Sequence, residues 1–219
     1  PGNAAQKTTE PESGFEVSFP DGWKTGRLTT LPGPHIAGVL EQEGGRAVCV
    51  FGAEDVPQTK KLTQAKMNED LRTPVGRDFW RNNIYRSLGD VKFESDGVRE
   101  HPSGIVIQEA EVTANGPGAA SAIRLRLTSA LYATPGKTYT STCSALPAAF
   151  ESYRATFRAI VDSFRPNQGG LSASINPPPG VGDGSAAVVQ AAQVAPAEML
   201  KSADKDVAAS VFSNPEFKK

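Results

Sequence analysis

The stretch from Tyr139 to Pro166, YTSTCSALPAAFESYRATFRAIVDSFRP, decides how this chain is interpreted, because it joins a strand, a turn and a helix without a break. Its first part places Tyr139, Ser141 and Cys143 on one face and threonines on the other, which is the two-residue period of a strand. Pro147 follows at the first turn of a helix, where a missing N–H costs nothing. A closing strand that leads directly into a helix is therefore predicted.

The predicted helix spans residues 146–164 and is amphipathic. Its apolar residues fall on a single stripe, namely Leu146, Phe150, Tyr153, Phe157, Ile160, Val161 and Phe164. Such a stripe must be buried against another element, so the helix is expected to lie on a sheet. We expect the core to form around Phe150, Phe157 and Leu125.

Strand patterns precede this stretch along most of the chain. Residues 91–101, 104–114, 122–133 and 137–145 are four strand-like runs separated by short Pro- and Gly-containing turns, which predicts an antiparallel meander. In the third run Leu125 and Leu127 point one way while Arg124 and Arg126 point the other, as in a sheet with one apolar face.

The first half of the chain contributes further elements. Residues 15–19 alternate as a strand and break at a turn before Trp23. Residues 27–34 have the composition of a loop, and the runs 35–43 and 46–54 that follow have that of a β-hairpin. Helical spacing then predicts two short helices, at 62–71 and 77–88.

Composition divides the chain into four segments. Residues 1–13 are small and polar and are expected to form a flexible lead-in to a folded domain at 14–166. Residues 167–195 are rich in Gly, Pro and Ala and are predicted to be a linker, because they cannot bury enough apolar surface to offset their ordering entropy. Residues 196–219 are predicted to be a tail with a weak helical pattern at 196–212, and this helix would either stay disordered or dock on another surface.

The charge balance excludes several kinds of partner. With 23 basic and 24 acidic side chains the formal charge is −1, which predicts no attraction to nucleic acid or to an anionic membrane surface. No run approaches the roughly 20 apolar residues that span a bilayer. The polar lead-in is typical of a chain that follows a removed export signal, so an extracytoplasmic location is expected.

Two cysteines, Cys49 and Cys143, each occupy a strand-like run. The residues leave three interpretations open: two buried structural thiols, a single disulfide formed in an oxidising compartment, or a nucleophile. Buried thiols are the preferred interpretation, because a small apolar residue would fit either position equally well. A nucleophile is the weakest, because no histidine is near either cysteine in the sequence.

No constellation for catalysis emerges from the remaining polar residues. His35 and His101 are interpreted as exposed turn residues, and Glu109 and Glu111 as solvated charges on one face of a strand. Arginines near Trp80 are interpreted as a solvated helix face rather than a surface for RNA. No nucleotide-binding or nucleophile motif is present. The sequence therefore predicts a protein that is not an enzyme and takes no metal or cofactor.

Two groups of residues resemble a known family. They are Phe15, Pro20 and Trp23 at the start of the domain, then Tyr139, Ala145, Ile160, Ser163 and Phe164 at its end. Over residues 13–166 the chain resembles the PsbP-like and Mog-like superfamily, which includes the extrinsic photosystem II protein PsbP and bacterial lipoprotein-like relatives. The resemblance implies an α+β fold in which an antiparallel sheet is sandwiched between helices, here with an extended C-terminal tail, and it implies binding rather than catalysis.

Two functions follow as hypotheses. The first is a non-enzymatic accessory subunit that docks on a larger extracytoplasmic complex, such as a membrane-bound respiratory or photosynthetic one, and stabilises it with the tail as an extended arm. The partner-binding residues of that arm would be Ile175, Val188, Val189, Met199, Val207 and Phe212. The alternative is a carrier for a small apolar ligand held between the sheet and the helix.

Overall fold

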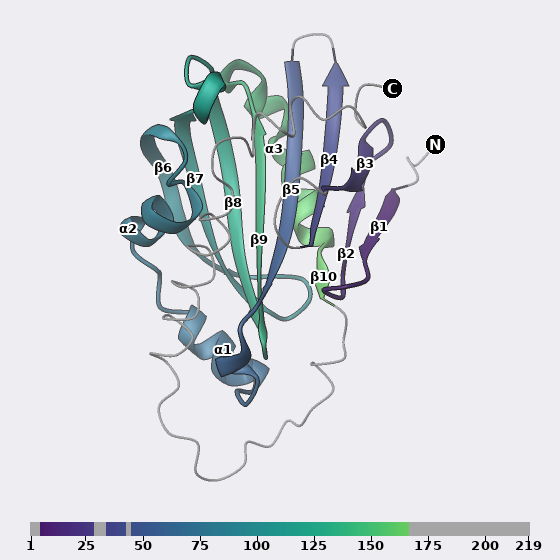
Figure 1. The fold of residues 1–219 in the computed structure, drawn as a ribbon, viewed down its shortest axis with the longest axis vertical. Coiled ribbons are helices and arrows are strands. Elements are labelled where there is room, and N and C mark those ends of the chain that lie inside the picture. The colour runs from purple at the N-terminus through teal and green to yellow at the C-terminus, as the bar shows by residue number, and fades with distance from the viewer. Residues whose placement is uncertain (1–4, 29–33, 43–44, 167–219) are drawn as a thin grey trace.

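The computed structural model describes residues 5–28, 34–42 and 45–166, and these form an α+β fold built on two antiparallel sheets. The larger sheet has seven strands in the order β3-β4-β5-β9-β8-β7-β6, and the smaller has three in the order β1-β2-β10. Figure 1 shows the large sheet face-on, with β6 at its left edge and α3 behind the strands. The predicted tail at 167–219 lies outside the described residues.

The strands follow the predicted hairpin and meander closely. The hairpin at 35–54 and the four-strand meander at 91–145 are both confirmed, and each pairs with antiparallel register. The large sheet comprises β3 (Lys24–Arg27), β4 (His35–Gln42), β5 (Gly45–Asp55), β6 (Gly89–Glu100), β7 (Val106–Asn115), β8 (Arg124–Thr134) and β9 (Lys137–Ala145).

Helix α3 (Pro147–Ser163) packs on one face of the large sheet as predicted, but on the face that the sequence marks as polar. Ala130 and Tyr132 of β8 point into the cluster beneath α3. Leu125 and Leu127 alternate with them and belong to a different cluster on the opposite face. The expected core around Phe150, Phe157 and Leu125 is therefore wrong: Leu125 lies on the other side of the sheet from both phenylalanines.

Short helices cover that opposite face. Helix α1 (Gln64–Leu71) begins after Thr63, whose side chain accepts a hydrogen bond from the Lys66 N–H at 3.2 Å. Helix α2 (Arg77–Phe79) continues as a π-helical turn, η2 (Trp80–Ile84). Trp80 and Tyr85 are buried against the leucines of β8. The helix predicted at 77–88 therefore ends at residue 84, and it consists of an α-helical turn followed by a π-helical turn. The remaining short elements are the 3₁₀ turns η1 (Pro57–Thr59) and η3 (Gly118–Ala120).

The small sheet closes the core beside α3. It consists of β1 (Gln6–Glu10), β2 (Phe15–Phe19) and β10 (Arg165–Pro166). Phe19 packs so closely on β4 that a Cβ added to Gly38 would lie 2.2 Å from its ring, so only glycine fits there. The expected flexible lead-in at 1–13 is wrong for residues 6–10, which pair with β2 along their whole length.

A second correction concerns residues 24–27, whose strand β3 pairs with β4. The start of the predicted loop at 27–34 is only partly a loop, because Arg27 still belongs to that strand and the Leu28 N–H donates to the His35 carbonyl oxygen at 3.0 Å. Backbone pairing with the long hairpin, rather than any alternation in KTGR, creates this edge strand.

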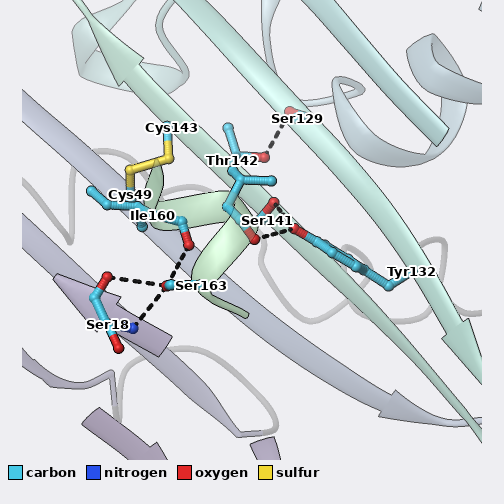
Figure 2. The surroundings of a disulfide bond; sticks show 10 residues. Ser18, Cys49, Ser129, Tyr132, Ser141, Thr142, Cys143, Ile160 and Ser163 are labelled. Carbon is cyan, nitrogen blue, oxygen red and sulfur yellow. Dashed lines mark hydrogen bonds between the residues drawn. A yellow bond between two sulfur atoms is a disulfide. The ribbon is translucent and has the colours of Figure 1, made fainter. Parts of the chain in front are cut away.

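A disulfide between Cys49 and Cys143 joins β5 to β9, where the two residues are direct partners in the strand register. Both are fully buried in the core cluster under α3. Figure 2 shows the bond beside α3, close to Ser141 and Thr142 of β9. The sequence left three interpretations open, and the structure contains the disulfide. The preferred interpretation, two buried free thiols, is therefore wrong.

Replacing both cysteines by alanine is expected to lower the free energy of unfolding by about 4 kcal/mol, because the bond closes a long loop in the unfolded chain. The cysteines are 94 positions apart. Urea titration of wild type and the double variant measures the loss. Wild type denatured without reductant should not react with a thiol reagent, and labelling at both cysteines would contradict the structure.

Candidate functional site

A groove of about 560 Å³ runs between α3 and the β6 side of the large sheet. Its floor includes Ser95 and Gly97 of β6 and Thr128 of β8, all with small side chains or none. Its wall is the face of α3 that carries Arg154 and Arg158. The groove exists because α3 packs against β5, β8, β9 and β2, which leaves the β6 side of the same face uncovered by that helix.

Two ion pairs connect α3 to β7 across this groove. Arg154 contacts Glu111 at 2.5 Å, and Arg158 lies 3.5 Å from Glu109. Residues four apart on a helix and residues two apart on a strand are separated along the axis by nearly the same distance, about 6 to 7 Å. The two ion pairs therefore lie side by side like parallel rungs. We call these four residues the ladder.

Each rung is extended by further charges. Glu111 also accepts from Arg126 of β8, and Glu109 from Arg99 of β6 at 2.7 Å. On α3 itself, Glu151 pairs with Arg154 at 2.8 Å and Asp162 with Arg158 at 3.2 Å. Four arginines are thus matched by four carboxylates, and Asp96, which also lines the groove, pairs with Arg77 at 2.7 Å.

The guanidinium groups also stack on an aromatic ring. Arg126 and Arg154 lie 4.9 and 5.2 Å from the centre of the Phe150 ring. Hydrogen bonds from Arg154 hold the pKa of the Glu151 carboxyl at about 2, well below its ordinary range. The same bonds to Glu151, and those to Glu111, raise the pKa of Arg154. These groups stay ionised at any physiological pH.

The carboxylates and guanidinium groups of this network are thus paired with one another. The expectation that Glu109 and Glu111 are solvated charges is wrong: they share a face, as predicted, but both are paired, and Glu111 is buried. No group of three or more His, Cys, Asp or Glu side chains suited to a metal ion occurs in the described part of the chain.

Both histidines are buried, which corrects their interpretation as exposed turn residues. His101 stacks edge-on against Tyr132, with ring centres 5.5 Å apart. Its Nε2 lies 3.0 Å from the Val161 carbonyl oxygen and therefore carries the proton, while Nδ1 accepts from the Ser103 N–H at 3.1 Å. His101 joins the β6–β7 turn to the end of α3 as a structural residue.

The pKa of the His101 imidazole is lowered from its ordinary 6.5, chiefly because burial disfavours the charged form. The hydrogen bond to Val161 opposes this shift. Arg99 and Arg165 also lower the pKa, while Asp162 raises it. The neutral imidazole is thus the form that the fold favours.

The other residues singled out in the sequence lie elsewhere. Arg77 and Arg81 stack on Phe93, about 5 Å from its ring centre, and Trp80 is buried, so they form no open basic and aromatic surface. The six residues assigned to partner binding lie outside the described residues, namely Ile175, Val188, Val189, Met199, Val207 and Phe212. The ladder was not predicted from the sequence. Its signal was the spacing of the charges: Arg154 and Arg158 are one helical turn apart, and Glu109 and Glu111 are two residues apart on a strand.

Comparison with solved structures identifies the fold as PsbP-like. The cyanobacterial PsbP (CyanoP) of Synechocystis sp. PCC 6803 is 15% identical and superposes with a TM-score of 0.50, covering 75% of this chain and 93% of its own. LpqN of Mycobacterium tuberculosis, described as involved in cell envelope biogenesis, is 11% identical with a TM-score of 0.43, covering 74% and 91%. The sequence matches no protein-family model and no curated protein.

The PsbP-like fold therefore rests on the arrangement of elements and not on sequence identity. Within residues 5–28, 34–42 and 45–166, no helix is long and apolar enough to cross a membrane.

Replacing Glu111 by alanine is expected to lower the free energy of unfolding by about 3 kcal/mol, because Arg126 and Arg154 lose their shared buried partner. Glu151→Ala is the matched control: Glu151 serves the same two arginines from an exposed position, so its loss should cost much less. Urea unfolding of the two variants measures both effects. Equal losses would show that burial of Glu111 contributes nothing to the ladder.

Stability is expected to fall as the pH drops from about 7.5 towards 5, because the unfolded chain protonates His101 more readily than the folded chain does. The slope contributed by one such group is at most about 1.4 kcal/mol per pH unit. His101→Gln keeps a donor for the Val161 carbonyl and removes the titration. Chemical unfolding at several pH values should show a shallower dependence for this variant, and identical slopes would assign the effect to other groups.

Proposed function

We propose that the protein is a non-enzymatic accessory subunit that docks on a larger extracytoplasmic complex and stabilises it. The observation that carries this proposal is the charge-matched groove. Its arginines and carboxylates already neutralise one another, so the site provides recognition without an unpaired acid, base or nucleophile.

The disulfide supports an extracytoplasmic location, because such bonds persist in oxidising compartments and are rare where thiols are kept reduced. The PsbP-like fold is consistent with an accessory role by analogy with the cyanobacterial PsbP. In this proposal the host is a membrane-bound complex, and the protein reaches it from the aqueous side.

The C-terminal segment 167–219 serves as an arm in this proposal. An extended segment contacts a wide area with few residues, and separate apolar side chains anchor it in separate pockets. Its anchors would be Ile175, Val188, Val189, Met199, Val207 and Phe212.

The alternative of an apolar-ligand carrier has less support. The groove is large enough for a small molecule, but Glu109, Glu111, Arg154 and Arg158 line it, and burying an apolar ligand there would desolvate these charges.

Deletion of residues 167–219 is expected to abolish or strongly reduce co-purification of the partner complex from cells in mild detergent, while the folded domain keeps its melting temperature. A full-length variant with Met199, Val207 and Phe212 changed to serine should weaken capture in the same direction. Co-purification that is unchanged in both proteins would contradict the role of the arm.

A further inference from the structure

Strand β6 is the edge of the large sheet, and its outward backbone groups can be assigned. The His101 N–H donates to the Ile105 carbonyl at 2.8 Å, so this pair at the β6–β7 turn is hydrogen-bonded. Bonded pairs alternate along antiparallel strands, so the groups of Ser95, Gly97 and Arg99 face β7. The N–H and C=O groups of Asp96, Val98 and Glu100 consequently point away from the sheet, and among the described strands none pairs with them.

The two halves of this edge differ. Register shifts interrupt the pairing with β7 between Gly89 and Lys92 and again between Phe93 and Ser95. Irregularities of this kind protect an edge from pairing with other chains. From Ser95 to Glu100 the register is unbroken, so only this half presents evenly spaced backbone groups to an incoming strand.

The groove lies along the same regular half, because Ser95, Asp96, Gly97 and Val98 all line it. On the α3 side of β6 the floor is nearly bare: a Cβ added to Gly97 would meet no atom within 4 Å. A long side chain on a strand added beside β6 would therefore pass over Gly97 into the groove without a clash.

Of the two arginines that line the groove, Arg158 is the one paired with the carboxylate opposite Gly97. Gly97 pairs with Glu109 in the register, and Arg158 stands 3.5 Å from Glu109 on the wall of the groove. Arg99 already holds Glu109 and Asp162 at 2.7 and 2.6 Å. The Arg158 side chain is 53% exposed, and among the described residues it donates one hydrogen bond, to Asp162 at 3.2 Å. Its remaining donors suit a carboxylate.

We propose that the regular half of β6 binds an extended, acidic segment of a partner protein as an added strand, with a glutamate of that segment on Arg158. This inference rests on the proposed accessory function. It identifies the β6 edge as the surface, and backbone pairing with one charged contact as the chemistry, by which the folded domain binds its partner. Backbone hydrogen bonds to Asp96 and Val98 supply the affinity, and the carboxylate selects for acidic sequences.

The test uses the full chain and two capped heptapeptides, TVEVEVT and TVKVKVT, which place two like charges on one face of a strand. Titration followed by amide NMR shifts should show the glutamate peptide binding about tenfold tighter, the value of one good charged hydrogen bond. The shifts should concentrate on residues 95–100.

Two variants separate the backbone from the charge. Val98→Pro removes an outward N–H without touching the bonds to β7, so both peptides should lose binding. Arg158→Gln should leave the backbone pairing and abolish the preference for glutamate. Lys92→Ala, on the irregular half of the same edge, is the control and should bind like wild type.

Equal affinity for the two peptides, wild-type binding by Val98→Pro, or shifts confined to another surface would overturn the proposal. So would dimerisation of the chain through β6 in the absence of peptide. The accessory function is tested separately: if Val98→Pro and Arg158→Gln still co-purify the partner complex at wild-type levels, the edge is wrong and the function stands. If wild type recovers no complex while the glutamate peptide binds, the function fails instead.

Discussion

The burial of Phe164 at the end of α3 is the constraint on which the rest of the structure depends. This fully buried ring contacts aromatic residues of β2, β5, the β6–β7 turn, β8 and β9, with ring centres 4.4 to 6.3 Å away; these are Phe15, Phe51, His101, Tyr132 and Tyr139. The preceding Ser163 accepts from the Ser18 N–H at 2.9 Å, which fastens the small sheet to the same point (Figure 2). One end of the helix thus joins both sheets and the β6–β7 turn.

The position of the helix explains the groove. With its end fixed over the centre of the large sheet, α3 covers β5, β8 and β9 and contacts β6 on that face through the ion pair between Asp162 and Arg99. The ladder from Arg154 and Arg158 to β7 fills part of the uncovered area with paired charges, which tolerate both water and a partner. A site of this kind suits recognition, because its ion pairs are already formed in the free protein. They rearrange only when a charged group of a partner binds.

Much of the fold was predictable because its strands and its final helix carry regular periods of apolar residues. What the sequence could not show was which face each period would bury. Leu125 and Leu127 look like the floor beneath α3, yet Trp80 and Tyr85 cover them, and nothing local in the sequence assigns that partner. Strand β1 has no alternation at all, since QKTTE becomes a strand only by pairing with β2. His101 is buried by Val161 and Tyr132, which are distant in the chain. The ladder was missed for the same reason: its two halves lie on different elements.

Hydrogen–deuterium exchange of the protein, alone and within the assembly purified from its own cells, tests the central claim that the folded domain docks through the β6 edge. The account predicts that the outward amides of Asp96, Val98 and Glu100 exchange markedly more slowly in the assembly, while amides on the irregular half of β6 exchange at the same rate in both states. Equal exchange of these three amides in the two states, with protection appearing on another surface, would contradict it.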